Sequence, residues 1–201
     1  MAPKDDEVNV SRRNFLKTVG VVGGAASVIT LGDAEAQTGP RVIGPGEVPI
    51  TLTVNGKRYD TRIEPRATLL DTIRNRFDLT GSKRVCNRGT CGACTVIIDS
   101  RTYYSCSLLA IEWQGKNVRT VEGLTSGDRM HPVQQAFVDQ DAQMCGFCTP
   151  GMVMASVALL ERYPSATTEQ MKRELDGNIC RCGTYPHIFK AIAQAKGVAR
   201  G

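Results

Sequence analysis

The placement of eight cysteines constrains this chain more than any other feature of its sequence. None lies in the first 85 residues, and eight in 201 residues exceed what packing alone requires. They fall into two groups of four, which predicts two separate sites. The first tetrad is Cys86, Cys91, Cys94 and Cys106, and the second tetrad is Cys145, Cys148, Cys180 and Cys182.

The first tetrad begins in the loop VCNRGTCGACTV, residues 85–96. Its three cysteines have the C-x4-C-x2-C spacing of plant-type 2Fe–2S ferredoxins. A cluster of this kind needs four thiolates that converge on a small anionic core. Gly89 and Gly92 allow the loop to turn sharply and to direct backbone N–H groups at the sulfurs. The loop therefore favours an iron–sulfur cluster.

Cys106 completes the first tetrad. Residues 94 and 106 are symmetric about Ser100, the middle of a predicted hairpin turn, so we expect Cys94 and Cys106 to be cross-strand neighbours with Cβ atoms about 4.5–5.5 Å apart. Structural zinc and disulfides are the alternatives. Zinc sites usually pair two short C-x2–4-C knuckles, and three cysteines within nine residues leave few unstrained disulfides.

The second tetrad consists of two short motifs, CGFC at residues 145–148 and CRC at residues 180–182, each just before a predicted helix start. The free N–H groups and positive dipole ends of two helices would then face one anionic site. Zinc is a stronger alternative here because C-x2-C is its commonest knuckle. A C-x-C pair is unusual for zinc, and a disulfide between residues i and i+2 would be strained. Iron–sulfur is again favoured.

The residues around the first tetrad predict a compact α+β domain over 48–124. Alternating apolar residues on both sides of Asn55-Gly56 predict a hairpin. Thr68, with Asp71 three residues later, is a candidate N-cap for a helix that buries an apolar stripe. The other strands are expected at 96–98, 102–104 and 117–124.

From residue 125 to residue 201 the pattern changes to short helices. One is expected over 132–140, and a second begins at Thr149-Pro150 and ends at Pro164. A third has Thr167 and Gln170 as a capping box and Gly177 as its stop, and the last runs over 186–197. Four helices in this length predict a small bundle.

The first 36 residues have the three parts of an export signal in order. SRRNFLK at residues 11–17 is a twin-arginine pattern, residues 19–31 form a mildly apolar run, and Ala34-Glu35-Ala36 is an A-x-A cleavage site. The run is shorter than the roughly 20 residues that span a bilayer. The alternative is a disordered basic arm on a cytosolic protein.

This segment resembles a Tat signal peptide. The resemblance implies export of the folded protein to the periplasm, a mature chain that begins near Gln37, and no stable membrane anchor after signal removal. Residues 37–47 have the Gly and Pro content of a flexible lead-in.

Charge and composition argue against two other classes of function. The net charge of +5 comes from scattered basic residues, and aromatic residues make up only 5% of the chain, so no nucleic-acid surface is predicted. The two histidines, His131 and His187, each lie beside a proline at a predicted helix start. They look like surface or interface residues, and no catalytic residue is expected in this chain.

Taken together, CNRGTCGACTV with a following cysteine, then CGFCTPGM, then GNICRCGTY resemble the iron–sulfur subunit of molybdenum hydroxylases, the xanthine oxidase and aldehyde oxidoreductase family. The resemblance covers residues from about 48 to 197 with all eight cysteines in register. Together with the Tat signal it points to the small subunits of periplasmic aldehyde oxidoreductases. It implies a β-grasp ferredoxin-like domain followed by an all-α four-helix-bundle domain, each with one 2Fe–2S cluster.

The same resemblance implies partners. The bundle cluster would lie next to molybdopterin in a large subunit, and the first cluster would pass electrons to FAD in a medium subunit. Cys182 would approach the pterin. In many relatives a Gln directly precedes C-G-x-C and touches the pterin, whereas here that position is Met144 and Gln143 lies one residue earlier.

The sequence thus predicts an electron-transfer subunit of a molybdenum-containing oxidoreductase that acts on aldehydes, or alternatively on N-heterocycles. A free-standing ferredoxin-like carrier and a zinc- or disulfide-stabilised binding protein are the rival hypotheses. Co-purification with a large subunit would exclude the free-standing carrier. Iron in the purified protein would exclude the zinc- or disulfide-stabilised binding protein.

Overall fold

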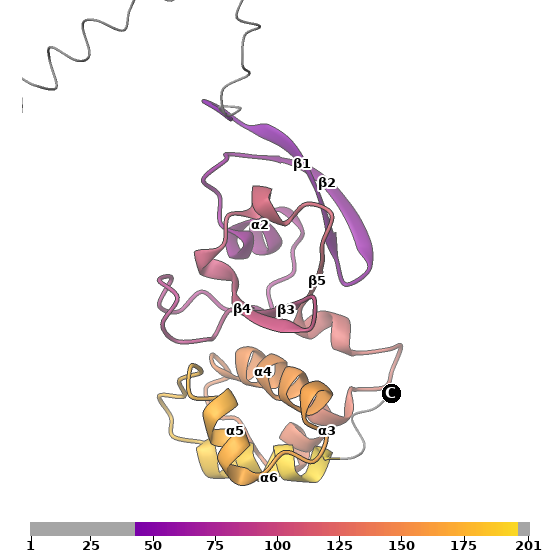
Figure 1. Ribbon diagram of the computed structural model, residues 1–201, viewed down its shortest axis with the longest axis vertical. Helices are drawn as coiled ribbons and strands as arrows, with labels where there is room; N and C mark the ends of the chain where they lie inside the picture. Colours follow the sequence, from indigo (N-terminus) through magenta and orange to yellow (C-terminus); the bar gives the residue numbers. More distant parts are fainter. Residues whose placement is uncertain (1–42, 197–201) are drawn as a thin grey trace, which may run out of the picture. The chain divides into compact units, whose positions relative to one another are not determined.

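A computed structural model describes residues 43–196 of the chain (Figure 1). The predicted signal peptide, residues 1–36, and residues 37–42 of the predicted lead-in lie outside the described residues. Within residues 43–196, no helix combines the length and apolar character that crossing a membrane would require.

The predicted hairpin at Asn55-Gly56 is confirmed. Strands β1 (Val48–Val54) and β2 (Lys57–Ile63) pair antiparallel. Both turn residues have positive φ, 53° at Asn55 and 76° at Gly56, as a two-residue hairpin turn requires. Alternate residues of β1 are buried, so this hairpin covers one side of the core.

A second hairpin and a short strand complete the sheet. Strands β3 (Thr95–Ile98) and β4 (Arg101–Tyr104) pair antiparallel, and β5 (Asn117–Arg119) lies between β1 and β3 in the order β2-β1-β5-β3-β4. β5 is parallel to β1 and antiparallel to β3. This mixed sheet packs on helix α2 (Leu69–Arg76), which begins at the predicted cap because the Thr68 hydroxyl accepts the Asp71 N–H.

The predicted strand over 117–124 is wrong beyond Arg119. The chain turns instead into a short 3-10 helix, η3 (Val121–Leu124). The Asn55 side chain causes this turn: its Oδ1 accepts the Thr120 N–H at 2.8 Å, and its Nδ2 donates to the Thr120 hydroxyl at 2.9 Å. Two more 3-10 helices, η1 (Ser105–Ser107) and η2 (Ala110–Trp113), were not predicted.

The remaining described residues contain the four predicted helices, although the third helix ends at Glu174 and not at the predicted stop, Gly177. The helices are α3 (Pro132–Asp139), α4 (Thr149–Arg162), α5 (Thr168–Glu174) and α6 (Tyr185–Ala195). The predicted capping box at α5 is confirmed, because Thr167 and Gln170 exchange side-chain and backbone hydrogen bonds. All four helices contribute to one apolar core.

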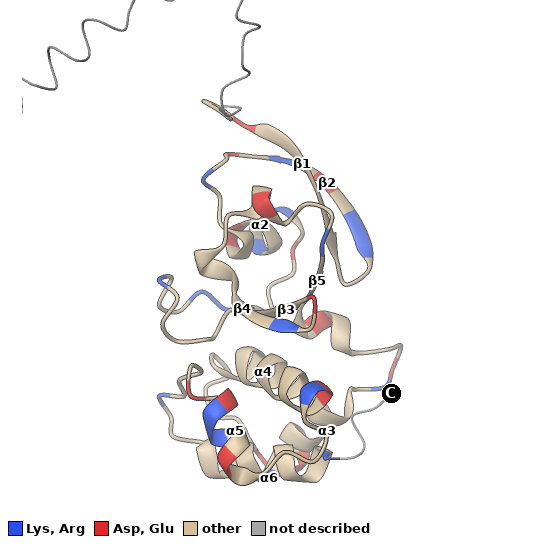
Figure 2. Ribbon diagram, in the orientation of Figure 1, with Lys and Arg blue, Asp and Glu red and all other residues tan. Residues whose placement is uncertain are grey.

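Helix α4 joins this helical domain (α3 to α6) to the sheet domain (β1 to η3). It lies against β3 and β4, and Ile97 of β3 belongs to the helical core (Figure 1). Figure 2 shows charge on α4 only near its C-terminal end, where Glu161 accepts two hydrogen bonds from Arg119 at 2.8 and 3.2 Å. Because the first turns of α4 are buried, the two domains share a packed face near both cysteine tetrads.

Candidate metal centres

The first cysteine loop wraps closely because several of its residues have left-handed backbone conformations. Gly89 and Gly92 both have φ of 71°, as the sequence predicted, and Asn87 has φ of 52°. The loop directs backbone N–H groups at sulfurs: Gly89 N lies 3.3 Å from Cys106 Sγ, and Thr90 N lies 3.4 Å from Cys86 Sγ. Such N–H groups stabilise thiolates around an anionic cluster.

The hairpin that carries Cys94 and Cys106 differs from the prediction by one residue. The β3–β4 turn contains only Asp99 and Ser100, which both have positive φ, and the resulting register places Cys94 opposite Ser105. The Ser105 N–H and hydroxyl both donate to the Cys94 carbonyl, at 3.3 and 2.8 Å. The predicted cross-strand pairing of residues 94 and 106 is therefore wrong. Turn η1 nevertheless places Cys106 in the same small buried cluster as Cys94.

The second tetrad lies where two helices begin. Cys148 is the N-cap residue of α4, and Cys180 and Cys182 come just before Thr184, the N-cap residue of α6. Cys145 Sγ and Cys182 Sγ are 3.4 Å apart. Cys180 Sγ lies 3.1 Å from Thr184 Oγ1.

The cysteines of each tetrad therefore lie near one another in pairs. The pairs are Cys86 with Cys91, Cys94 with Cys106, Cys145 with Cys182, and Cys148 with Cys180. All eight cysteines, which lie within the described residues, are free thiols. Within residues 43–196, no three Cys, His, Asp or Glu side chains gather around one point as the ligands of a single ion do. Two pairs per tetrad fit a 2Fe–2S cluster, because two cysteines bind each of its irons.

Local hydrogen bonds lower the pKa values of some of the thiols, whereas burial raises the pKa values of others. A hydrogen bond from the Thr90 side chain lowers the pKa of Cys86 to about 5. Burial raises the pKa of Cys180, but hydrogen bonds from Thr184 outweigh it and bring that pKa to about 7. Burial raises the pKa values of Cys94 and Cys148 to about 12. Each tetrad thus combines a sulfur that ionises readily with one that needs a cation beside it to become a thiolate.

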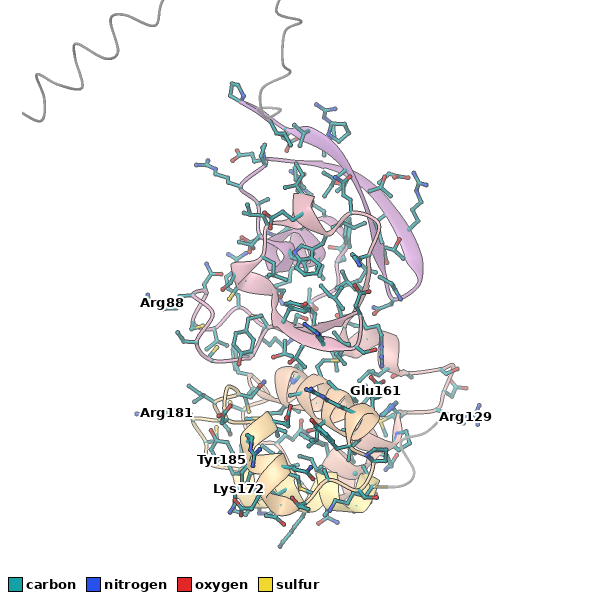
Figure 3. All side chains as sticks on the ribbon, in the orientation of Figure 1. Arg88, Arg129, Glu161, Lys172, Arg181 and Tyr185 are labelled. Carbon is teal, nitrogen blue, oxygen red and sulfur yellow. The ribbon has the colours of Figure 1, made fainter. Side chains whose placement is uncertain are left out.

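The two tetrads differ in exposure. Cys94 and Cys106 are buried, whereas Cys145 and Cys182 are exposed. Three apolar residues adjacent in sequence to the second tetrad are also exposed, Met144 to 73%, Phe147 to 58% and Ile179 to about half of its surface. Gln143 is exposed as well. Figure 3 shows Arg88 and Arg181, one from each cysteine loop, projecting on the same side of the described part of the chain.

Both histidines contact backbone atoms of nearby segments. His131 is the N-cap residue of α3, where its Nδ1 accepts the Val133 N–H at 3.2 Å. His187 Nδ1 lies 2.8 Å from the Gln140 carbonyl oxygen. Sequence reasoning missed the polar partners of the cysteines, Thr90 and Thr184. Their positions four residues after Cys86 and Cys180 are a signal that could have identified them.

Two family models match the chain, a 2Fe-2S iron-sulfur cluster binding domain over residues 52–124 and a 2Fe-2S binding domain over residues 120–193. The fold and the two tetrads define a protein with two 2Fe–2S-binding domains in tandem.

Comparison with known proteins identifies the family. The chain is 36% identical, over 95% of its length, to the aldehyde oxidoreductase iron-sulfur-binding subunit PaoA of Escherichia coli (strain K12), of which it covers 90%. It is 44% identical, over 77% of its length, to a subunit of nicotinate dehydrogenase from Pseudomonas putida, of which it covers 98%. Quinoline 2-oxidoreductase from Pseudomonas putida 86 matches with a TM-score of 0.73 and 37% identity, over 77% of this chain and 98% of that chain. This chain belongs to the family of iron–sulfur small subunits of molybdenum hydroxylases, which are molybdenum-containing oxidoreductases.

Proposed function

We propose that this chain is an electron-transfer subunit that relays electrons from a molybdopterin centre in a large subunit towards FAD in a medium subunit or towards an external acceptor. When bound, a 2Fe–2S cluster takes up and releases single electrons, whereas oxidation of the substrate releases two. The chain would hold one cluster with Cys86, Cys91, Cys94 and Cys106, and the other with Cys145, Cys148, Cys180 and Cys182.

The observation that carries this proposal is the exposed second tetrad and its apolar surroundings. A contiguous group of large apolar residues is uncommon on a monomer and marks a contact with a partner. Met144, Phe147 and Ile179 lie in the two loops that carry Cys145 and Cys182, whose sulfurs are 3.4 Å apart, and all five residues are exposed. We infer that the large subunit covers this face and brings its pterin near Cys182. The exposed Gln143 is a candidate for the contact that Met144 does not provide.

Aldehydes are the substrate class that we propose for the complex. The match to PaoA leaves only about a twentieth of this chain unaligned, so it includes most of the residues before Ile43. The second candidate is oxidation of an N-heterocycle. The higher identity to the nicotinate dehydrogenase subunit favours it, although over a shorter part of the chain. Oxidation of an aromatic aldehyde and of nicotinate by the purified complex distinguishes the two.

We also propose that the mature chain consists of the lead-in over 37–47, a β-grasp domain over 48–124 and a four-helix bundle within 125–201. Support for the bundle comes from the core that α3, α4, α5 and α6 share. Support for the division near residue 124 comes from the two family models, which overlap only over residues 120–124.

Assembly with the large subunit is tested by co-expression and affinity purification. Met144→Glu places a carboxylate on the proposed contact, where burial of an unpaired charge costs several kcal/mol, so the large subunit should no longer co-purify. Val138→Glu is the matched control, because Val138 is 58% exposed but lies in the last turn of α3, outside both loops of the second tetrad. Both variants should keep their iron. Equal recovery of the large subunit with both variants would contradict the proposal, and a wild-type chain that purifies alone would support the free-standing carrier.

Export is proposed to follow the Tat pathway, with the clusters inserted before the folded complex reaches the periplasm. The support is the twin-arginine motif, the apolar run and the A-x-A site in order. Replacing Arg12 and Arg13 by Lys should leave iron-loaded protein in the cytoplasm, as measured by cell fractionation and immunoblotting. Normal export of this variant would refute the pathway.

A further inference from the structure

The two cysteine loops touch one another at the face between the sheet domain and the helical domain. The Ile179 N–H donates to the Cys91 carbonyl oxygen at 2.9 Å. Cys91 is a proposed ligand of the first cluster, and Ile179 directly precedes Cys180, a proposed ligand of the second. One hydrogen bond thus joins the backbone of a first-tetrad residue to the peptide that leads into the second tetrad.

The Asn178 side chain fixes this contact. Its Nδ2 donates to the Gly92 carbonyl oxygen at 3.0 Å and lies 3.2 Å from Thr95 Oγ1. Thr95 Oγ1 in turn donates to the Gly92 carbonyl at 2.6 Å. Asn178 is only 5% exposed, so water does not replace these bonds. A buried amide with both partners in the other domain acts as a clamp, because leaving its donors unpaired would be costly.

Glycines allow the loops to approach this closely. A Cβ atom on Gly92 would lie 2.6 Å from Cγ and Nδ2 of Asn178. A Cβ atom on Gly151, in the first turn of α4, would overlap the Gly92 carbonyl oxygen. The backbones on the two sides of this face are therefore in direct contact, with no side chain between them.

We propose that Asn178 is a positioning residue for electron transfer between the two clusters, an inference that rests on the function proposed above. It holds the loop of Cys91 against the segment that precedes Cys180, so that the Cys91–Ile179 hydrogen bond closes a continuous bonded route between the tetrads. One electron leaves the cluster of the helical domain and one electron enters the cluster of the sheet domain. Electronic coupling decays more slowly along covalent and hydrogen bonds than across a gap, so loss of the clamp slows this transfer.

The test uses the purified complex with Asn178→Leu, which keeps a side chain of similar size and removes the amide. Iron content and the paramagnetic signals of both reduced clusters first establish that each cluster is present. The rate of electron transfer between the clusters, measured after rapid reduction, should fall by on the order of tenfold, since positioned groups lose this much when they shift by a fraction of an ångström. The magnetic interaction between the reduced clusters should weaken, and the amide of Ile179 should exchange hydrogen faster by mass spectrometry.

Arg119→Gln is the matched control. It breaks the Arg119–Glu161 ion pair across the same domain face but leaves the cysteine loops untouched, so the transfer rate should stay at the wild-type value. If Asn178→Leu does not assemble, Thr95→Val removes one partner of the clamp and should produce a smaller loss of rate in the same direction. A variant with both clusters and an unchanged rate and magnetic interaction overturns the proposal. A wild-type complex without two iron signals would instead overturn the proposed function.

Discussion

The two tetrads are built on different scaffolds and protect their sulfurs to different degrees. The first uses a loop whose sulfurs accept backbone N–H groups, with Cys94 only 2% exposed beside strand β3. The second uses the starts of helices α4 and α6 and leaves Cys145 and Cys182 at the surface. The sheet domain therefore shields much of its own site. The helical domain leaves one sulfur pair exposed at its surface.

Under the proposed electron-transfer function, this difference bears on where electrons would enter and leave the chain. An exposed sulfur pair favours close approach of an outside redox group, whereas a buried pair favours protection from water. The Cys91–Ile179 hydrogen bond lies between the two sites. The arrangement suits entry at the helical domain and onward transfer through the sheet domain.

Replacing one buried and one exposed cysteine gives the largest expected effect. Cys94→Ser and Cys145→Ser should each reduce iron from about four to about two per chain, because each removes a ligand of one 2Fe–2S cluster. Cys94 also packs with Leu70 and Cys106 in a small buried cluster, so its replacement should lower the thermal unfolding midpoint more than Cys145→Ser does. Iron analysis and calorimetry measure the two effects. Equal thermal losses would show that the tetrads do not differ in their structural role.

A comparison of two glycines distinguishes the cost of backbone strain from the cost of a steric clash. Gly92 has φ of 71° and faces Asn178, whereas Gly115 has φ of 79° and open space around it. Alanine at either position should lower the free energy of unfolding by about 1–2 kcal/mol, because the left-handed conformation is unfavourable for a residue with a Cβ atom. Gly92→Ala should lower the free energy of unfolding by roughly a further 1–3 kcal/mol, because its methyl group collides with Asn178 at the contact between the domains. Denaturant unfolding of the two variants measures the difference. Equal free energies of unfolding would show that the close approach at Gly92 contributes nothing.

The features predicted correctly from the sequence are those with local causes. The Asn55-Gly56 turn and the caps at Thr68 and Thr167 depend on residues within a few positions of one another, and each was found as predicted. Cys145 Sγ and Cys182 Sγ, grouped in one tetrad by the sequence, lie 3.4 Å apart, and the assignment of each tetrad to one cluster stays a prediction.

The features that sequence reasoning missed depend on distant residues or on a one-residue choice. The Asp99-Ser100 turn contains no glycine, so the sequence did not distinguish it from a turn centred on Ser100. The end of β5 depends on the side chain of Asn55, which is 65 positions from Thr120. Asn178 contacts Gly92 and Thr95, which lie 86 and 83 positions earlier in the chain, and nothing within either segment predicts that contact.

The smallest predicted effect concerns pH and sharpens the contrast between the domains. Both histidines of the chain lie in the helical domain. Burial, together with the charge of Arg119, lowers the pKa of His131 below its ordinary value of 6.5, although Glu161 opposes the shift. Well above pH 6.5 the imidazole is neutral in both the folded and the unfolded chain, and its cap on α3 contributes fully. As the pH falls below 6.5 the unfolded chain takes up the proton first, so stability declines until the pH has passed the lowered pKa of the folded state.

His131→Asn isolates this contribution, because asparagine caps a helix N-terminus but does not titrate in this range. The wild-type protein should lose stability relative to the variant between about pH 7 and pH 5, a window set by the ordinary histidine pKa. Thermal unfolding midpoints of the two proteins, measured across this window, provide the comparison, and the carboxylates and cysteines that both proteins share cancel. Because the sheet domain contains no histidine, amide exchange should locate the extra opening of the wild-type protein at low pH in α3. Parallel pH profiles for the two proteins would show that the imidazole of His131 keeps an ordinary pKa when folded.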